Sequence, residues 1–131
     1  MKGTPLSSLR SLSGLSGLKA VVTGGASGIG LATSRMLAEH GATVAALDLA
    51  PSGAPEPLIA IRADLGDDAS VRSAVAEAAE RLGGLDILVN NAGIGAIGTV
   101  EDNPDEEWHR VLDVHVIGTV RTTRAALPDL R

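Results

Sequence analysis

The 131-residue sequence predicts an α/β fold, in which helices cover a doubly wound parallel sheet. Short apolar runs alternate with segments of helical periodicity in β-α-β-β-α-β-α order, and such alternation is typical of parallel sheets. The fourth run, residues 85–90, is almost continuously apolar, which indicates a strand covered on both faces. A glycine-rich turn joins the first strand to the first helix. We therefore expect four strands and three main helices.

The first three strands are expected at residues 18–23, 43–47 and 58–62, where short apolar runs occur. A helix should follow the first strand and end near residue 40, because the next residue is a glycine, which commonly ends helices. Residues 49–57 hold three prolines, which exclude a helix. The connection between the second and third strands is therefore predicted to be short and irregular.

Two further helices are predicted in the second half of the chain. Asp67 or Asp68 should cap a helix that ends near residue 82, before two glycines. Asn103 should cap the last helix, because Pro104 then takes its first position and three acidic residues follow in the turn where the dipole favours anions. We expect this last helix to end at about residue 127.

Composition excludes several classes of protein. There is no cysteine, so no disulfide framework or thiolate metal site can form, as is usual in a reducing cytosol. A net charge of -5 argues against nucleic-acid binding, which needs clustered Lys and Arg. No apolar run approaches the roughly 18 residues that cross a bilayer. We expect a cytoplasmic protein without nucleic-acid or membrane partners, and the histidines show no metal-ligand spacing.

Residues 1–17 are expected to form a loose N-terminal extension to a domain at residues 18–131. The extension contains no acidic residue, so a transit peptide is an alternative. Its leucines recur every three residues, a spacing that drifts around a helix and forms no single apolar face. The plain extension is therefore the favoured interpretation.

The glycine-rich turn covers residues 23–30 and reads Thr-Gly-Gly-Ala-Ser-Gly-Ile-Gly. Backbone N–H groups at the start of the following helix can hold a pyrophosphate there, and glycines let a ligand approach the backbone closely. Glycine is also the ordinary turn residue. Because a strand precedes this turn and a helix follows it, we predict dinucleotide binding.

Asp48 ends the second strand about 20 residues beyond the turn, as the dinucleotide fingerprint requires. Its carboxylate can accept hydrogen bonds from ribose hydroxyls and would repel a 2'-phosphate. No Arg or Lys occurs at residues 24–30 or 49–53, where a 2'-phosphate would need a cationic partner. NAD is therefore expected over NADP, the alternative being that Asp48 is a solvated strand end.

These residues resemble the signatures of the short-chain dehydrogenase/reductase family. Thr23-Gly24-xxx-Gly28-x-Gly30 resembles its glycine pattern, Asp64-Leu65 its adenine-binding pair, and Asn90-Asn91-Ala92-Gly93 its signature after the fourth strand. Taken alone, the two asparagines are equally compatible with a strand-end turn. The resemblance implies a Rossmann-like sheet of order 3-2-1-4, truncated relative to that of a full-length member, and an NAD-dependent oxidoreductase acting on a secondary alcohol or ketone. It assigns the pyrophosphate to Gly24, Ser27, Gly28, Ile29 and Gly30, the adenosine ribose to Asp48, the adenine to Asp64 and Leu65, and the nicotinamide-side ribose to Asn91, Ala92 and Gly93.

The catalytic set of the family is a Ser, a Tyr and a Lys. This chain has no tyrosine, its lysines are Lys2 and Lys19, and it ends at Arg131, before the strand that would carry the Ser. We therefore expect the 131 residues alone to be inactive, and the alternative is a non-catalytic NAD-binding fragment or remnant. His115 stands at the family's Asn position. It could hold a water or titrate near neutrality, but a helical residue without a catalytic part is favoured.

An open sheet edge is expected at the fourth strand, because it has no further strand to pair with. The last helix would then leave part of its apolar face uncovered, and an open edge and an apolar face both favour pairing with another chain. We therefore expect a marginally stable chain that forms a homo-oligomer or aggregates. The apolar residues of that helix are Trp108, Val111, Leu112, Val116, Ile117 and Val120.

Overall fold

The computed structural model describes residues 14–130, and the candidate transit segment therefore lies mainly outside the described residues. Strands and helices alternate along the chain, as predicted. The elements are β1 (Lys19–Thr23), α2 (Gly28–Glu39), β2 (Thr43–Asp48), the 3-10 turn η1 (Pro51–Gly53), β3 (Ile59–Arg62), α3 (Asp68–Leu82), β4 (Ile87–Val89), α4 (Asp105–Leu112), the π-helical segment η2 (Asp113–Ile117) and α5 (Gly118–Leu130).

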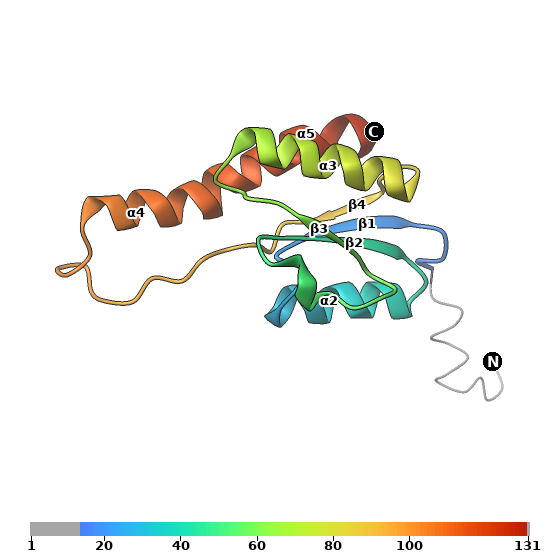
Figure 1. Ribbon diagram of the computed structural model, residues 1–131, viewed down its shortest axis with the longest axis horizontal. Coiled ribbons are helices and arrows are strands. Elements are labelled where there is room, and N and C mark those ends of the chain that lie inside the picture. Colours follow the sequence, from blue (N-terminus) through green and yellow to red (C-terminus); the bar gives the residue numbers. More distant parts are fainter. Residues whose placement is uncertain (1–13, 131) are drawn as a thin grey trace.

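The four strands form one parallel sheet in the order β3-β2-β1-β4, which confirms the predicted α/β architecture. In the register, Val21 of β1 lies opposite Ala45 of β2 and Leu88 of β4. Helix α2 covers one face of the sheet, and α3 and α5 pack side by side on the other (Figure 1). Because all strands run the same way, their carboxyl ends meet at one edge.

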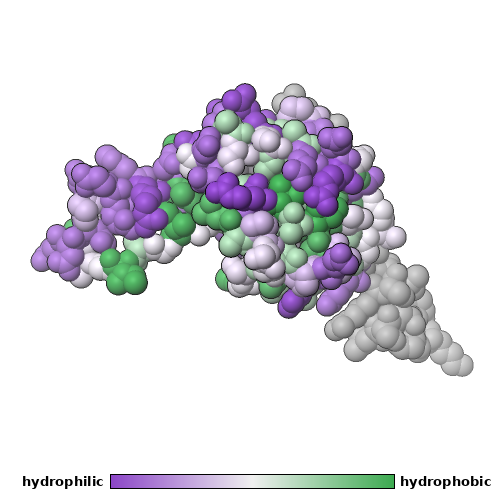
Figure 2. Space-filling model, viewed as in Figure 1, coloured by the Kyte–Doolittle hydropathy of each residue, from purple (hydrophilic) through white to green (hydrophobic). Residues whose placement is uncertain are grey.

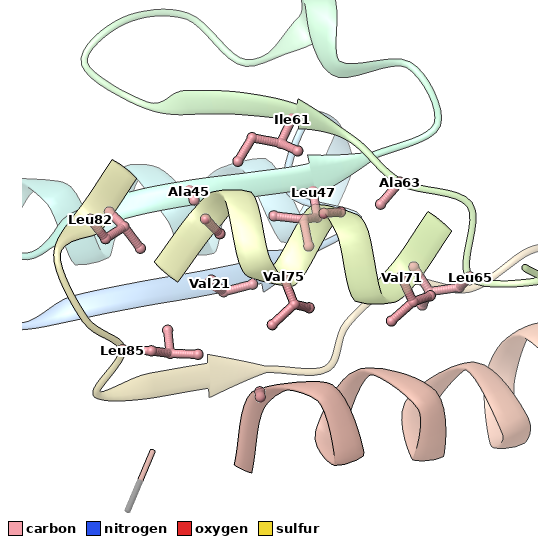
Figure 3. Packing of buried hydrophobic residues seen from close by; sticks show 13 residues of the cluster. Val21, Ala45, Leu47, Ile61, Ala63, Leu65, Val71, Val75, Leu82 and Leu85 are labelled. Atoms are coloured by element: carbon pink, nitrogen blue, oxygen red, sulfur yellow. The ribbon is translucent and has the colours of Figure 1, made fainter. Parts of the chain in front are cut away.

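Small aliphatic side chains fill both layers between sheet and helices. On the α3 side, Val21 and Leu47 of the sheet pack against Val71 and Val75 (Figure 3). On the α2 side, the core consists mainly of alanines and valines of β1 and β2. Interior packing of this kind leaves few voids, so the helices lie close to the sheet and fix the strand ends firmly.

Helix α3 begins and ends as the sequence predicts. Asp67 is its N-cap, and Oδ1 of Asp67 accepts hydrogen bonds from the N–H groups of Ala69, at 3.0 Å, and Ser70, at 3.4 Å. Gly83 follows the helix with a φ of 76°, the left-handed conformation that favours glycine. The N-cap also ends the loop between β3 and α3, which carries Asp64.

The last helix differs from the prediction in two ways. Its N-cap is Pro104, with no side-chain capping bond, so the prediction that Asn103 caps it is wrong. The extended backbone of Pro104, at φ −71° and ψ 165°, ends the loop one residue later than expected. The helix is also not uniform, because η2 interrupts it between α4 and α5. Apolar periodicity continues through this interruption, so the sequence pattern does not reveal it.

Helix α4 projects beyond the sheet, at the end of the long loop that leaves β4 (Figure 1). Apolar residues remain about half exposed along α4, η2 and α5, and hydrophobic surface lies where the projection meets the body of the molecule (Figure 2). Among the described residues, no helix is long and apolar enough to cross a membrane. The exposed apolar residues of this face are Trp108, Leu112, Val116, Ile117, Val120 and Leu127.

Candidate functional site

A cleft of about 200 Å³ opens at the carboxyl edge of the sheet. Four segments meet around it, the turns after β1, β2 and β3 and the loop after β4, and η2 contributes one further side chain. This edge is where parallel α/β sheets hold ligands. The lining residues are Gly24, Ser27, Leu47, Asp48, Leu49, Ala63, Asp64, Leu65, Asn91, Ala92, Gly93, Ile94 and Val114.

Glycines of the first turn let three backbones approach one another. Gly24 has a φ of 64°, and a Cβ there would lie 2.9 Å from the Cα of Ala92. Gly30 is buried in the first turn of α2, where a Cβ would collide with the carbonyl oxygen of Gly24. Real Cβ atoms do not tolerate such contacts. The turn after β1 therefore lies tightly between α2 and the loop after β4.

The N-terminus of α2 points its unpaired backbone N–H groups toward this turn. Ser27 is the N-cap, but its side chain makes no capping hydrogen bond, and no acidic residue occupies the first turn. Neither the side chain of the N-cap nor a residue of the first turn therefore offsets the positive end of the helix dipole. Ser27 lines the cleft, whereas Gly28, Ile29 and Gly30 do not, and Ile29 is 80% exposed.

Asp48 lies half-buried at the end of β2, with both carboxylate oxygens held by backbone amides. The N–H of Ala26 donates to Oδ2 at 3.1 Å, and the N–H of Ala50 donates to Oδ1 at 3.0 Å. A carboxylate oxygen can accept further hydrogen bonds. These contacts fix the orientation of the carboxylate in the cleft and leave acceptor sites for a ligand hydroxyl.

Asp64 and Leu65 follow β3 on the same side of the cleft. Oδ1 of Asp64 accepts from the N–H of Gly66 at 2.9 Å, and the N–H of Asp64 donates to Oγ of Ser70 at 2.9 Å. Leu65 is buried, and it gives this wall an apolar surface. An apolar wall beside a fixed carboxylate can accommodate a planar base whose edge carries a hydrogen-bond donor.

Thr23 joins β1 to the segment after β4, a role that sequence reasoning missed. Its fully buried Oγ1 accepts from the N–H groups of Asn91 and Ala92, at 3.0 Å each. The side chain of Asn91 donates to the carbonyl oxygens of Thr23, at 3.1 Å, and Gly24, at 3.4 Å. The sequence does show a threonine at the end of an apolar strand, which could have indicated a hydrogen-bonding role. Its partners could not be predicted, because they lie nearly 70 residues away along the chain.

Arg121 of α5 contacts the Leu65 wall of the cleft, and sequence reasoning did not predict this contact. Its guanidinium donates to both carboxylate oxygens of Asp113, at 2.9 and 3.2 Å, and to the carbonyl oxygen of Leu65 at 2.8 Å. The hydrogen bonds with Asp113 raise the pKa of Arg121 above its ordinary value. Asp113 begins η2, so the hydrogen bonds of Arg121 connect the loop that carries Leu65 to the π-helical segment.

His115 extends from the same π-helical segment to the other wall of the cleft. Its Nε2 lies 2.9 Å from the nitrogen and 2.8 Å from the oxygen of Ile94. The side chain of His115, which belongs to η2, therefore contacts the loop after β4. Among the described residues, no cluster of three or more histidines and acids has the geometry to hold a metal ion.

Comparison with known proteins identifies relatives over most of the chain. The profile of the short chain dehydrogenase family matches residues 18–131. Oxidoreductase UcpA of Salmonella typhimurium is 37% identical, a match covering 88% of this chain and 48% of that protein. D-beta-hydroxybutyrate dehydrogenase of Rhizobium meliloti is 35% identical, with coverages of 86% and 48%. The chain thus spans about half the length of these curated relatives.

Solved structures share the same architecture. A short chain dehydrogenase from Burkholderia cenocepacia in complex with NADP superposes with a TM-score of 0.82 at 39% identity, covering 88% of this chain and 52% of that one. A dehydrogenase/reductase from Sinorhizobium meliloti gives a TM-score of 0.84 at 36% identity, with coverages of 96% and 54%. These matches place the cleft in a fold that, in one relative, has been solved with a dinucleotide.

Proposed function

The chain belongs to the short-chain dehydrogenase family, and we propose that it forms the NAD-binding part of an oxidoreductase acting on a secondary alcohol or ketone. Family membership implies a dinucleotide cofactor. The observation that carries the proposal is the cleft itself, in which the turn after β1, Asp48, the Asp64–Leu65 pair and the Asn91–Gly93 segment converge.

The cleft fits a dinucleotide in shape and charge. The glycine turn lies close against the loop after β4, because a Cβ at Gly24 would meet Ala92, and the N-terminus of α2 offers N–H groups to a pyrophosphate. Asp48 would accept from the adenosine ribose, Asp64 and Leu65 would contact the adenine, and Asn91 to Gly93 would face the nicotinamide-side ribose. The cofactor, when bound, supplies the hydride chemistry. The chain positions and orients it.

The preference for NAD over NADP rests on Asp48. A carboxylate held by the N–H groups of Ala26 and Ala50 cannot easily rotate away from an incoming 2'-phosphate. The turns at residues 24–30 and 49–53 carry no Lys or Arg to compensate that charge. The Burkholderia relative was solved with NADP, so the family fold does not by itself select NAD.

Turnover by these 131 residues is not expected. The family's proton transfer depends on a tyrosine, and this chain has none. General acid–base catalysis supplies about 10² to 10⁴ in rate, so its loss leaves hydride transfer too slow to detect. The alternative is a protein that binds NAD without catalysing any reaction. Formation of NADH by the 131-residue chain from NAD and a secondary alcohol would contradict both the expected inactivity and this alternative.

Calorimetric titration with NAD and with NADP tests the binding assignment. We expect the wild-type chain to bind NAD more tightly than NADP. Asp48→Asn keeps a side-chain oxygen but removes the charge, so NAD affinity should fall about tenfold and the preference over NADP should shrink. Asp102→Asn, on the exposed loop, is the matched control and should change neither affinity. An unchanged NAD/NADP ratio in a folded Asp48→Asn variant would contradict the ribose assignment.

A further inference from the structure

We propose that Arg121 is a positioning residue for recognition of the cofactor's base, and that it acts through the peptide group that follows Leu65. This peptide group in turn orients the carboxylate of Asp64. The inference rests on the proposed dinucleotide binding and deepens it, because it assigns a role to a residue that does not line the cleft. Arg121 belongs to α5 and lies outside the three signatures that resemble the family.

The peptide group between Leu65 and Gly66 is held at both of its polar ends. Its carbonyl oxygen, which belongs to Leu65, accepts from Nη1 of Arg121 at 2.8 Å. Its N–H, which belongs to Gly66, donates to Oδ1 of Asp64 at 2.9 Å. Because a peptide group is planar, a rotation that takes the oxygen away from the guanidinium also takes the N–H away from the carboxylate. Arg121 therefore controls the direction of the N–H that binds Asp64.

The guanidinium of Arg121 is itself fixed by a two-point contact. Its Nη2 donates to Oδ1 of Asp113 at 2.9 Å, and its Nη1 donates to Oδ2 at 3.2 Å. A bidentate contact of this kind fixes the plane of the guanidinium as well as its position. The side chain of Arg121 is only 16% exposed, so water screens the contact less than at an open surface. The orientation of Nη1 toward the carbonyl oxygen of Leu65 is therefore determined by Asp113.

Two glycines allow the helix and the loop to approach this peptide group closely. A Cβ at Gly118, the first residue of α5, would lie 3.0 Å from Cβ and 3.3 Å from the carbonyl oxygen of Leu65. A Cβ at Gly66 would lie 3.2 Å from Oδ1 of Asp64 and 3.5 Å from Oδ2 of Asp113. These distances are observations independent of the hydrogen bonds. They show that both carboxylates and α5 meet at one peptide group behind the wall of the cleft.

The chemical consequence of this arrangement concerns the amino group of adenine. The hydrogen bond between Gly66 and Asp64 is exposed to solvent, where such a bond contributes little by itself. A cation on the carbonyl oxygen polarises the peptide group and strengthens the hydrogen bond that its N–H donates. A carboxylate accepts at both oxygens, so Asp64 can bind the peptide N–H and an amino group of the base together. Arg121 therefore prepares Asp64 to select a base that carries a donor.

Calorimetric titration with NAD and with nicotinamide hypoxanthine dinucleotide tests this role. The second ligand has a carbonyl oxygen in place of the amino group of adenine, and a carboxylate repels that oxygen. We expect the wild-type chain to bind NAD about tenfold more tightly than the analogue. This ratio should fall to about twofold in Arg121→Met and take an intermediate value in Arg121→Lys, which keeps the charge without the two-point contact. Arg124→Met is the matched control, because Arg124 lies on the same helix, is 66% exposed and pairs with Asp68.

The ratio of the two affinities separates positioning from a general structural role. A general loss of stability would weaken both dinucleotides alike, so an Arg121→Met chain that keeps the wild-type ratio would overturn the inference. An equal fall of the ratio in Arg124→Met would overturn it too. Equal binding of the two ligands by the wild-type chain would remove the role of Asp64, and with it that of Arg121, while NAD binding stands. Failure of the wild-type chain to bind NAD would instead refute the proposed function.

The amide proton of Gly66 reports the same contact without a ligand. In a ¹⁵N-glycine-labelled chain, its hydrogen bond to a carboxylate should place this signal downfield, and Asp64→Asn should move it upfield. Arg121→Lys should move it in the same direction by a smaller amount, whereas Arg124→Met should leave it in place. A Gly66 signal that coincides in Arg121→Lys and the wild type would overturn the role of Arg121 even if NAD binds as proposed.

Discussion

At the scale of single residues, the glycine turn after β1 shows how one missing side chain determines a site. Gly30 lies inside a helix, where propensity alone favours alanine by about 1 kcal/mol. The buried position against the carbonyl group of Gly24 overrides that preference. Close packing of three backbones, and not conformational freedom at this residue, explains why glycine stands at position 30.

Gly30→Ala is expected to destabilise the chain by about 3 kcal/mol or prevent folding, because the added methyl group meets backbone that cannot easily move. Gly95→Ala is the matched control, since a Cβ there meets nothing within 4 Å, and its effect should stay within about 0.5 kcal/mol. Urea unfolding followed by circular dichroism measures both. A Gly30→Ala variant as stable as wild type would contradict the close approach.

At the scale of elements, strand β4 is joined to β1 by more than its ladder. β4 has three residues, and Thr23 extends the connection beyond them through the two amides that follow the strand. The same hydrogen bonds fix the positions of Asn91 and Ala92 in the wall of the cleft. The hydroxyl of Thr23 is therefore a structural part of the site although it does not line it.

Thr23→Val should lower the free energy of unfolding by about 3 kcal/mol, because it leaves two partly buried amide groups without their acceptor. Thr23→Ser, which keeps the hydroxyl, should lose less. Thr122→Val is the matched control: Thr122 is also fully buried, but its hydroxyl donates to the carbonyl of Gly118 in its own helix. Urea unfolding would refute this role if Thr23→Val and Thr122→Val were equally stable.

The last helix shows where element-level prediction failed. Its existence and its acidic first turn were predicted from the sequence, but the capping residue and the π-helical segment were not. A π-helical segment adds no sequence signal, because the apolar pattern continues through it. In this chain the segment supports both sides of the cleft, Asp113 through Arg121 toward Leu65 and His115 toward Ile94.

At the scale of the whole molecule, the apolar face of α4 and α5 and the edge strand β4 remain uncovered in the described chain. Trp108 is 45% exposed, Leu112 51% and Val116 52%. Exposed apolar patches of this kind commonly mark association surfaces, and an edge strand offers unpaired backbone groups to another chain. The expectation of self-association from the sequence remains a prediction.

Sedimentation velocity should detect concentration-dependent self-association of the 131-residue chain. Replacing Leu112 and Val116 together by Ser should weaken it, because both side chains lie on the apolar face. Ile97→Ser is the matched control, as Ile97 is 97% exposed and lies on the loop between β4 and α4, outside the helices, and it should leave association unchanged. Trp108 is the single tryptophan, so its fluorescence should shift to shorter wavelength on association. A wild-type chain that stays monomeric would contradict this prediction.

The sequence by itself determined the elements and the order in which they carry the candidate cofactor residues. Apolar runs, glycine turns and the cap of α3 act over a few residues, so they can be read along the chain. Only the tertiary structure decided which distant residues meet. Thr23 accepts hydrogen bonds from Asn91 and Ala92. Arg121 donates to the carbonyl oxygen of Leu65, and His115 contacts the backbone of Ile94. Those contacts join residues 20 to 70 positions apart, and they form because a parallel sheet brings the carboxyl ends of its strands to one edge.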